Sequence, residues 1–168
     1  MYQYNKDILD RNIHLLNKAL QKHQRILMIR FDVRYPKYLQ ADHDNHSIVK
    51  FIKRYRQYFA RLNYDPLYLW CREKNHSHNH HYHVYFFLDA TKLRFMPNLK
   101  KADEIWNNIL NIDQTTKGLI QYCNPAGLTI NRENIHVQQE ALEQLSYLAK
   151  IYSKQHLTGV RDWGSSSI

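Results

Sequence analysis

The chain has 168 residues, the length of one domain, and is 43% hydrophobic and 23% charged. This composition supports a buried core and excludes disordered, collagen-like and disulfide-scaffold chains. The 24 lysines and arginines outnumber the 15 aspartates and glutamates, giving a formal net charge of +9 that indicates an anionic partner, most often nucleic acid.

The first part of the chain is predicted to alternate helix, strand and helix. Apolar residues recur at helical spacing over about residues 6–23, which predicts an amphipathic helix. Residues 26–33 alternate apolar side chains and are predicted to form a strand. Asp44 and Ser47 are candidate N-caps of a second helix, which is expected to end near Leu62.

Two segments in the middle of the chain predict a long hairpin. Residues 67–74 and 81–88 are rich in strand-forming side chains and are joined by a histidine-rich loop. A third helix is predicted over about residues 97–112. Residues 118–137 lack a clear period and are expected to be irregular.

The last third of the chain adds short strands and a helix. Strands are predicted around residues 119–122 and 135–137, followed by a helix over about 138–155. The tail from Thr158 is expected to be loosely ordered. This order of elements predicts an α+β fold, one domain over residues 1–168 with a central antiparallel sheet and flanking helices, in a ferredoxin-like or RNA-recognition-like arrangement.

No membrane or secretory segment is predicted. The longest apolar runs, residues 67–71 and 84–88, are far shorter than the roughly 20 residues of a membrane span. The N-terminus lacks the layout of a signal peptide. Cys71 and Cys123 are expected to be buried thiols in a reducing compartment, so the expected location is the cytoplasm, without a membrane partner.

A His-x-His pattern in the second hairpin strand predicts a metal site. His81 and His83 lie two residues apart, so their side chains point to one face of the strand. Glu73 ends the preceding strand and is the expected third ligand. Two imidazoles and a carboxylate suit a divalent ion such as Mg²⁺ or Mn²⁺, and they also accept Zn²⁺, Ni²⁺ or Co²⁺. The other candidates for the third ligand are Asp32, His78 and His80.

The predicted last helix carries a candidate nucleophile. Tyr147, Lys150 and Lys154 follow helical spacing and are expected to share one face. Lysine ammonium groups favour a tyrosine phenolate and attract an anionic substrate. Tyr152 is expected on a second, apolar face. The alternative interpretation is an ordinary amphipathic helix with solvated lysines.

The predicted second helix has a strongly basic outer face. Lys50, Lys53 and Arg54 belong to a run with no acidic residue between Lys50 and Arg61. Such a run is either a solvated face or a surface that contacts nucleic-acid phosphates. We take these three residues, with Lys154, as the candidate nucleic-acid-binding residues.

These patterns in this order resemble the HUH endonuclease superfamily of rolling-circle replication initiators. The closer resemblance is to the replication-initiator family of filamentous phages (inoviruses) and related prophage proteins. The resemblance covers roughly residues 25–165, with a domain core of about 25–160. Its stretches are IRFDVRYP (29–36), LWCREK (69–74) with HYHVYFFL (81–88), GLIQYC (118–123) and SYLAKIYSK (146–154).

The resemblance implies a metal-dependent enzyme that nicks and rejoins single-stranded DNA at a replication origin. His81, His83 and Glu73 match the metal ligands, with Mg²⁺ or Mn²⁺ as the cofactor. Tyr147 matches the tyrosine that attacks the phosphodiester and leaves a covalent 5′-phosphotyrosine, and Lys150 matches the motif lysine. Some relatives have two tyrosines four residues apart, whereas Tyr152 is five away, so we expect one nucleophile. No helicase motif is present, so unwinding is expected to need a host helicase.

Three other functions are compatible with parts of the sequence. A single-tyrosine transposase of the same superfamily would need a dimer to complete its site. A non-catalytic nucleic-acid-binding module would explain the charge and the tyrosines but not His81, His83 and Lys150. A metal sensor or chelator would use the histidines between His76 and His83 and would not need Tyr147.

Overall fold

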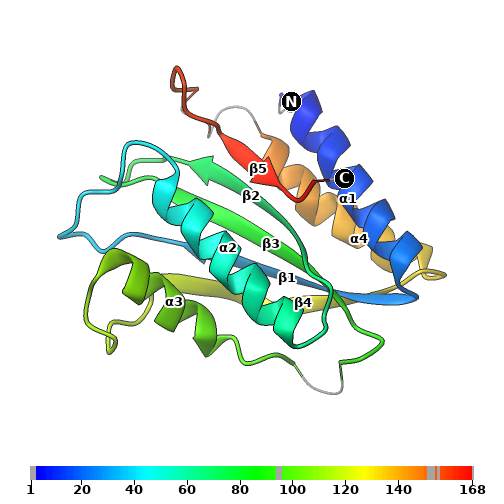
Figure 1. Cartoon of the computed structure of the whole chain (residues 1–168). Helices are drawn as coiled ribbons and strands as arrows, with labels where there is room; N and C mark the ends of the chain where they lie inside the picture. Colours follow the sequence, from blue (N-terminus) through cyan, green and yellow to red (C-terminus); the bar gives the residue numbers. More distant parts are fainter. Residues whose placement is uncertain (1–2, 94–95, 151–153, 155, 168) are drawn as a thin grey trace.

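The computed structural model describes residues 3–93, 96–150, 154 and 156–167. Its helices are α1 (Lys6–Lys22), α2 (His46–Arg61), α3 (Lys100–Leu110) and α4 (Ile135–Ser146), and its strands are β1 (Arg25–Val33), β2 (Leu67–Glu73), β3 (His81–Asp89), β4 (Ile120–Asn131) and β5 (Trp163–Ser165). The strands form one antiparallel sheet in the order β4-β1-β3-β2-β5 (Figure 1). The predicted α+β fold, with helices flanking a central antiparallel sheet, is therefore confirmed.

The middle of the fold follows the ferredoxin-like order of elements. The segment from β1 to β4 runs β-α-β-β-α-β and builds the strand order β4-β1-β3-β2. Helices α2 and α3 cover one face of the sheet, while α1 and α4 cover the other (Figure 1). Among the described residues, none of the helices is long and apolar enough to cross a membrane.

The central strand β3 explains why the hairpin sequence is so continuously apolar. All nine of its residues are buried, because helices cover both faces of the sheet. Val84 and Phe86 point into the core beneath α2 and α3, whereas Tyr85 and Phe87 point into the core beneath α1 and α4. His81 and His83 point to the same face as Tyr85 and Phe87, so they lie on the α1/α4 side of the sheet.

Helix α2 begins slightly differently from the prediction. Asn45 is the N-cap residue, although its side chain makes no capping hydrogen bond. Asp44 instead accepts a hydrogen bond from the backbone of His46, and Asp42 accepts one from the backbone of Ser47. Both predicted cap positions therefore lie at the helix start, but neither is the cap.

The segment predicted to be irregular is mostly one strand. β4 runs for 12 residues along β1 and contains a bulge between its two paired halves. Ile29 pairs with Gly127 and Phe31 pairs with Tyr122, so the single residue between them on β1 faces residues 123–126 of β4. Pro125 and the bulge hide the strand period in the sequence, and an edge strand tolerates both.

The end of the chain also differs from the prediction. Asn134 caps α4 by accepting a hydrogen bond from the Val137 amide, so residues 135–137 begin a helix and do not form a strand. The helix ends at Ser146, and a short 3₁₀ turn, η1 (Tyr147–Ala149), follows. The prediction for Tyr152 falls outside the described residues.

The tail forms the fifth strand of the sheet, contrary to the prediction of loose order. β5 pairs with β2, and Gly164 lies opposite Trp70. A Cβ atom at Gly164 would lie 2.6 Å from the Trp70 ring, so only glycine permits this close approach. The tail covers the outer edge of β2, which a sheet would otherwise expose.

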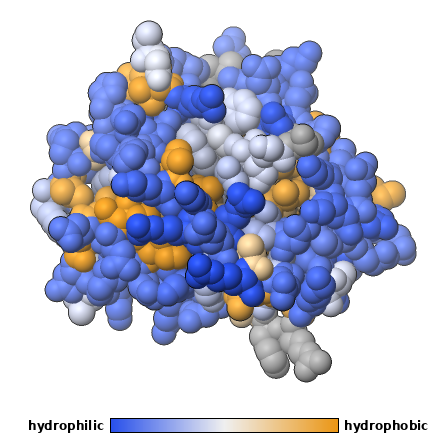
Figure 2. Space-filling view, viewed as in Figure 1, coloured by the Kyte–Doolittle hydropathy of each residue, from blue (hydrophilic) through white to orange (hydrophobic). Residues whose placement is uncertain are grey.

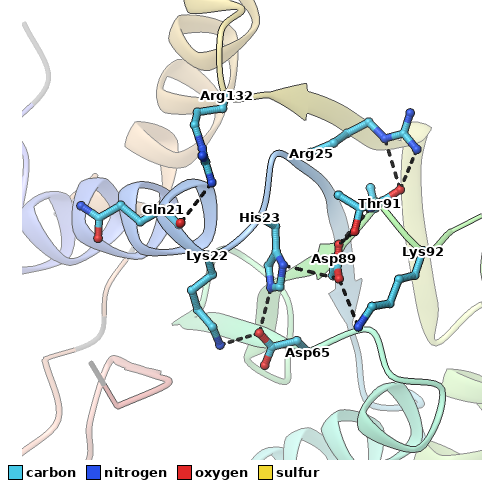
Figure 3. A network of polar contacts seen from close by, with 10 residues as sticks. Gln21, Lys22, His23, Arg25, Asp65, Asp89, Thr91, Lys92 and Arg132 are labelled. Carbon is cyan, nitrogen blue, oxygen red and sulfur yellow. Dashed lines mark hydrogen bonds and ion pairs between the residues drawn. The ribbon is translucent and has the colours of Figure 1, made fainter.

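A polar network around His23 joins the elements at the end of the sheet that lies away from His81 and His83 (Figure 3). His23, just after α1, contacts Asp65 at 2.8 Å and Asp89 at 3.4 Å. Asp89 also accepts a hydrogen bond from the Thr91 amide at 2.9 Å and pairs with Lys92 at 3.7 Å. The network ties α1 to β3 and to the turn before β2.

Asp89→Asn is expected to lower stability at pH 7 by about 1–3 kcal/mol, because a nearly buried carboxylate would lose its charge-assisted hydrogen bonds. Burial raises the pKa of Asp89, but the Thr91 hydrogen bonds and the charges of His23 and Lys92 outweigh it, so the net pKa is lowered. The carboxylate therefore stabilises the fold above its unfolded pKa of about 3.9 and loses this effect in stronger acid. Thermal melts from pH 3 to 7 would show a flatter acid limb for the variant, and parallel curves would contradict this prediction.

Candidate functional site

The pairing of three strands gathers the predicted metal ligands. Glu73 on β2 lies opposite His81 on β3, and Asp32 on β1 lies opposite His83. Residues that pair directly across an antiparallel sheet project from the same face. All four side chains therefore lie on the α1/α4 side of the sheet, at the end where the β2–β3 hairpin turns.

Glu73, His81 and His83 form a buried cluster that can hold a metal ion. One ligand atom from each residue lies within 4.8 Å of the other two, and the residues are 3%, 5% and 7% exposed. Nδ1 of His81 is buried and has no hydrogen-bond partner among the residues that the structure describes. A buried, unpartnered imidazole nitrogen beside a carboxylate fits a divalent cation.

The remaining candidates for the third ligand have other partners. Asp32 Oδ1 lies 2.5 Å from His83 Nδ1, while Glu73 Oε2 lies 3.1 Å from His83 Nε2. Asp32 thus orients the ring from behind, as carboxylates do for metal-binding histidines. His78 is exposed and contacts Gln40. His80 contacts Arg72 and the Tyr82 hydroxyl, away from the cluster.

The electrostatics of the cluster favour the ligand forms of Glu73 and His81. Burial raises the pKa of Glu73, but hydrogen bonds and charge from His83 and Lys154 outweigh it and lower the pKa to about 2. Burial, followed by the charge of His83, lowers the pKa of His81 to about 4. Burial alone would lower the pKa of His83, but hydrogen bonds to Asp32 and Glu73 raise it. At neutral pH Glu73 is ionised and His81 is neutral.

Lys154 belongs to this cluster and not to the surface. Its side chain is fully buried, and its Nζ lies 2.6 Å from Glu73 Oε1. Lys154 is a predicted nucleic-acid-binding residue, whereas in the structure its ammonium group is directed at the carboxylate of Glu73. This contact leaves Oε2 of Glu73 directed at His83.

Tyr147 lies on the same side of the sheet, but not on a helix. It begins the 3₁₀ turn after α4, and the residue is 43% exposed. Lys150 Nζ lies 3.7 Å from the centre of the Tyr147 ring, as the predicted pairing of these two residues requires. Because the helix has ended, the predicted single helical face of Tyr147, Lys150 and Lys154 does not exist.

Helix α1 holds η1, the turn that begins with Tyr147 and is called the tyrosine turn below. The sequence did not indicate this role of α1. Asn12 is fully buried, and its Nδ2 donates to the Leu145 carbonyl at 2.7 Å. The Asn5 amide donates to the Ala149 carbonyl at 2.6 Å, and Tyr4 forms a β-bridge with Lys150. A polar residue in the middle of an apolar helix face was the available signal.

Asn12→Ala is expected to destabilise the protein by about 1–3 kcal/mol, because the buried carbonyl of Leu145 would lose its donor. Asn17→Ala on the exposed side of the same helix is the matched control and should change stability by less than about 0.5 kcal/mol. Urea unfolding of both variants measures the difference. Equal midpoints for the two variants would contradict the proposed anchoring of the turn.

The basic face of α2 lies on the opposite side of the sheet from the metal cluster. Lys50, Lys53 and Arg54 are exposed, and Figure 2 shows hydrophilic side chains gathered over this helix. The buried face of α2 packs into the core that α2 and α3 form with the sheet. The structure therefore does not bring these three cations to Tyr147 or to the histidines.

A comparison with known protein families identifies the family of this chain. Residues 2–166 match the YagK/YfjJ C-terminal domain. The chain belongs to this family. The matched range contains the metal cluster, the tyrosine turn and the basic face of α2. Neither curated proteins nor solved structures gave a significant match to the chain.

Proposed function

We propose that this member of the YagK/YfjJ C-terminal domain family is a metal-dependent DNA endonuclease and strand transferase that initiates rolling-circle replication. The observation that carries the proposal is one shared face: the buried Glu73-His81-His83 cluster and the partly exposed Tyr147, with Lys150 against its ring, lie on the α1/α4 side of the sheet. A divalent metal site and a cation-flanked tyrosine are the parts that phosphodiester transfer to tyrosine requires.

The proposed reaction exchanges one phosphodiester for another. The Tyr147 hydroxyl forms a bond to phosphorus while the bond from phosphorus to the 3′ oxygen breaks. Tyr147 loses a proton and the departing 3′ oxygen gains one, which leaves a 5′-phosphotyrosine and a free 3′-hydroxyl. The reverse reaction rejoins a strand, because the covalent bond keeps the energy of the original linkage.

Each side chain of the site has a task in this reaction. Lys150 supplies positive charge over the ring of the tyrosine that becomes the phenolate. Glu73, His81 and His83 would hold Mg²⁺ or Mn²⁺, which supplies Lewis-acid polarisation of a phosphate oxygen. Asp32 keeps the His83 ring in position, and Lys154 keeps Glu73 in position.

The alternative of a non-catalytic binding module has less support. RNA-recognition-like modules bind bases on an open face of the sheet, whereas helices cover both faces here. A metal sensor built on the loop histidines also has less support, because His78 and His80 have partners outside the buried cluster. We place the proposed activity in the cytoplasm, acting on single-stranded origin DNA that a host helicase exposes.

The experiment that tests the proposal uses single-stranded oligonucleotides of randomised sequence, labelled at the 3′ end. The protein and Mn²⁺ are incubated with the pool and separated on a denaturing protein gel. We expect a labelled band that migrates with the protein and disappears with a chelator. Binding of the pool without any covalent band would contradict the nuclease and support the binding module.

A further inference from the structure

Arg30 is a charged residue in the middle of the central sheet. It lies on β1 between Ile29 and Phe31, both fully buried, and it pairs with Tyr85 on β3. It is two residues from Asp32, so its side chain shares the face of the metal cluster. Arginine rarely occupies such a position without a charged partner or a function.

The guanidinium group lies between two tyrosine rings. Its Cζ atom is 5.7 Å from the centre of the Tyr85 ring and 5.7 Å from the centre of the Tyr147 ring. Tyr85 is fully buried, and its hydroxyl donates to the Gln144 carbonyl at 3.2 Å, in the last turn of α4. One fixed ring therefore positions Arg30, and Arg30 in turn contacts the ring of the candidate nucleophile.

The hydrogen-bonding capacity of Arg30 is unused within the described part of the chain. Its Nε is buried and has no acceptor there. Asp32, the nearest acid along β1, contacts His83 and Arg34 instead, and Arg30 takes part in no ion pair of the described residues. Arg30 is half-buried, so a guanidinium group that lies over two rings and has no ion-pair partner among the described residues keeps donors for an anion.

The charge of Arg30 is maintained at all physiological pH values. Burial works to lower its pKa, but the neighbouring Tyr85, Cys123, Asp32 and Tyr147 outweigh burial and raise the pKa above the usual value. The strand next to it is interrupted, because Arg30 faces the four-residue bulge of β4. Arg30 thus combines a permanent charge, free donors and contact with Tyr147.

We propose that Arg30 is the phosphate-binding residue of the site, holding the DNA phosphodiester that Tyr147 attacks. Its guanidinium group donates to the non-bridging oxygens while it stays in contact with the rings of Tyr85 and Tyr147. This inference rests on the proposed function for the identity of the nucleophile. The same residue would place both reacting groups, which is the positional effect that transfer reactions need.

The first test measures binding of a single-stranded oligonucleotide in chelator, so that no cleavage occurs. Arg30→Gln is expected to bind about 10- to 100-fold more weakly than the wild type. The slope of log K against log salt should fall by about 0.7, the contribution of one phosphate contact on a single strand. Lys100→Gln, an exposed charge loss on α3, is the matched control and should leave both values unchanged.

The second test separates charge from geometry. Arg30→Lys keeps the charge and the aliphatic stem, so we expect it to restore the salt slope but not the rate of covalent adduct formation, because lysine cannot stack and donate as a planar fork. Thermal melts confirm that the variants fold. If both Arg30 variants kept wild-type affinity, salt slope and adduct rate, the proposal would be overturned. A wild-type protein that binds DNA with the predicted dependence on Arg30 but forms no adduct would overturn the nuclease alone.

Discussion

Tyr147→Phe is expected to abolish covalent adduct formation with single-stranded DNA, lowering the rate by at least about 10⁴-fold. The substitution removes only the hydroxyl group, so the ring keeps its contacts with Arg30 and Lys150. Oligonucleotide affinity in chelator should therefore stay within about twofold of the wild type. The measurement is the covalent band on a denaturing gel, followed over time beside an anisotropy titration.

Two tyrosine controls make this result specific. Tyr38→Phe alters a tyrosine that is 74% exposed in the segment after β1, and it should retain the full rate. Tyr152→Phe should also retain the rate, because we expect a single nucleophile. An adduct that persists in Tyr147→Phe and disappears in Tyr152→Phe would move the nucleophile to Tyr152 and contradict our assignment.

The second large effect concerns the metal cluster, where two ligands are expected to behave differently. His81→Gln should weaken Mn²⁺ binding by more than about 100-fold, because it removes an imidazole whose Nδ1 has no described partner. Its stability in chelator should change little. Glu73→Gln should weaken Mn²⁺ binding similarly and also cost about 3–5 kcal/mol of stability, because the buried Lys154 ammonium group loses the negative charge of Glu73.

Calorimetric Mn²⁺ titration and urea unfolding in chelator measure these two effects separately. His78→Gln, in the exposed part of the histidine-rich loop, is the control and should change neither. Loss of Mn²⁺ binding in His78→Gln but not in His81→Gln would favour the loop as the metal site. Equal stability of Glu73→Gln and the wild type would contradict the buried ion pair.

Much of the fold was predictable because its pattern is local. The helices α1 and α2 and the strands β1 to β3 agree with the predictions to within about two residues, since their apolar periods are uninterrupted. Only the start of β4 agrees with a predicted strand, around residues 119–122, because a bulge and Pro125 break the period of the rest. The strand β5 was missed because it forms by pairing with the edge of β2, which lies about ninety residues earlier in the chain.

The histidine pair and its partner Glu73 were predictable for a similar reason, whereas the other residues around them were not. Alternation along a strand places His81 and His83 on one face, and a short hairpin returns Glu73 beside them. Asp32 and Arg30 reach the site through β1, which is distant in sequence. Asn12 on α1 binds the Leu145 carbonyl, and Lys154 contacts Glu73, which lies 81 residues earlier in the chain.

The sequence by itself therefore determined the class of the fold, the strand that presents two histidines to one face, and the approximate position of the tyrosine. The tertiary structure alone decided which acid faces the histidines, that Lys154 is buried against Glu73, and that the basic face of α2 lies across the sheet from Tyr147. The physical reason is the distance along the chain over which each feature is determined. Side-chain direction along one element follows from its local backbone geometry, whereas contacts between elements depend on register and packing across the whole chain.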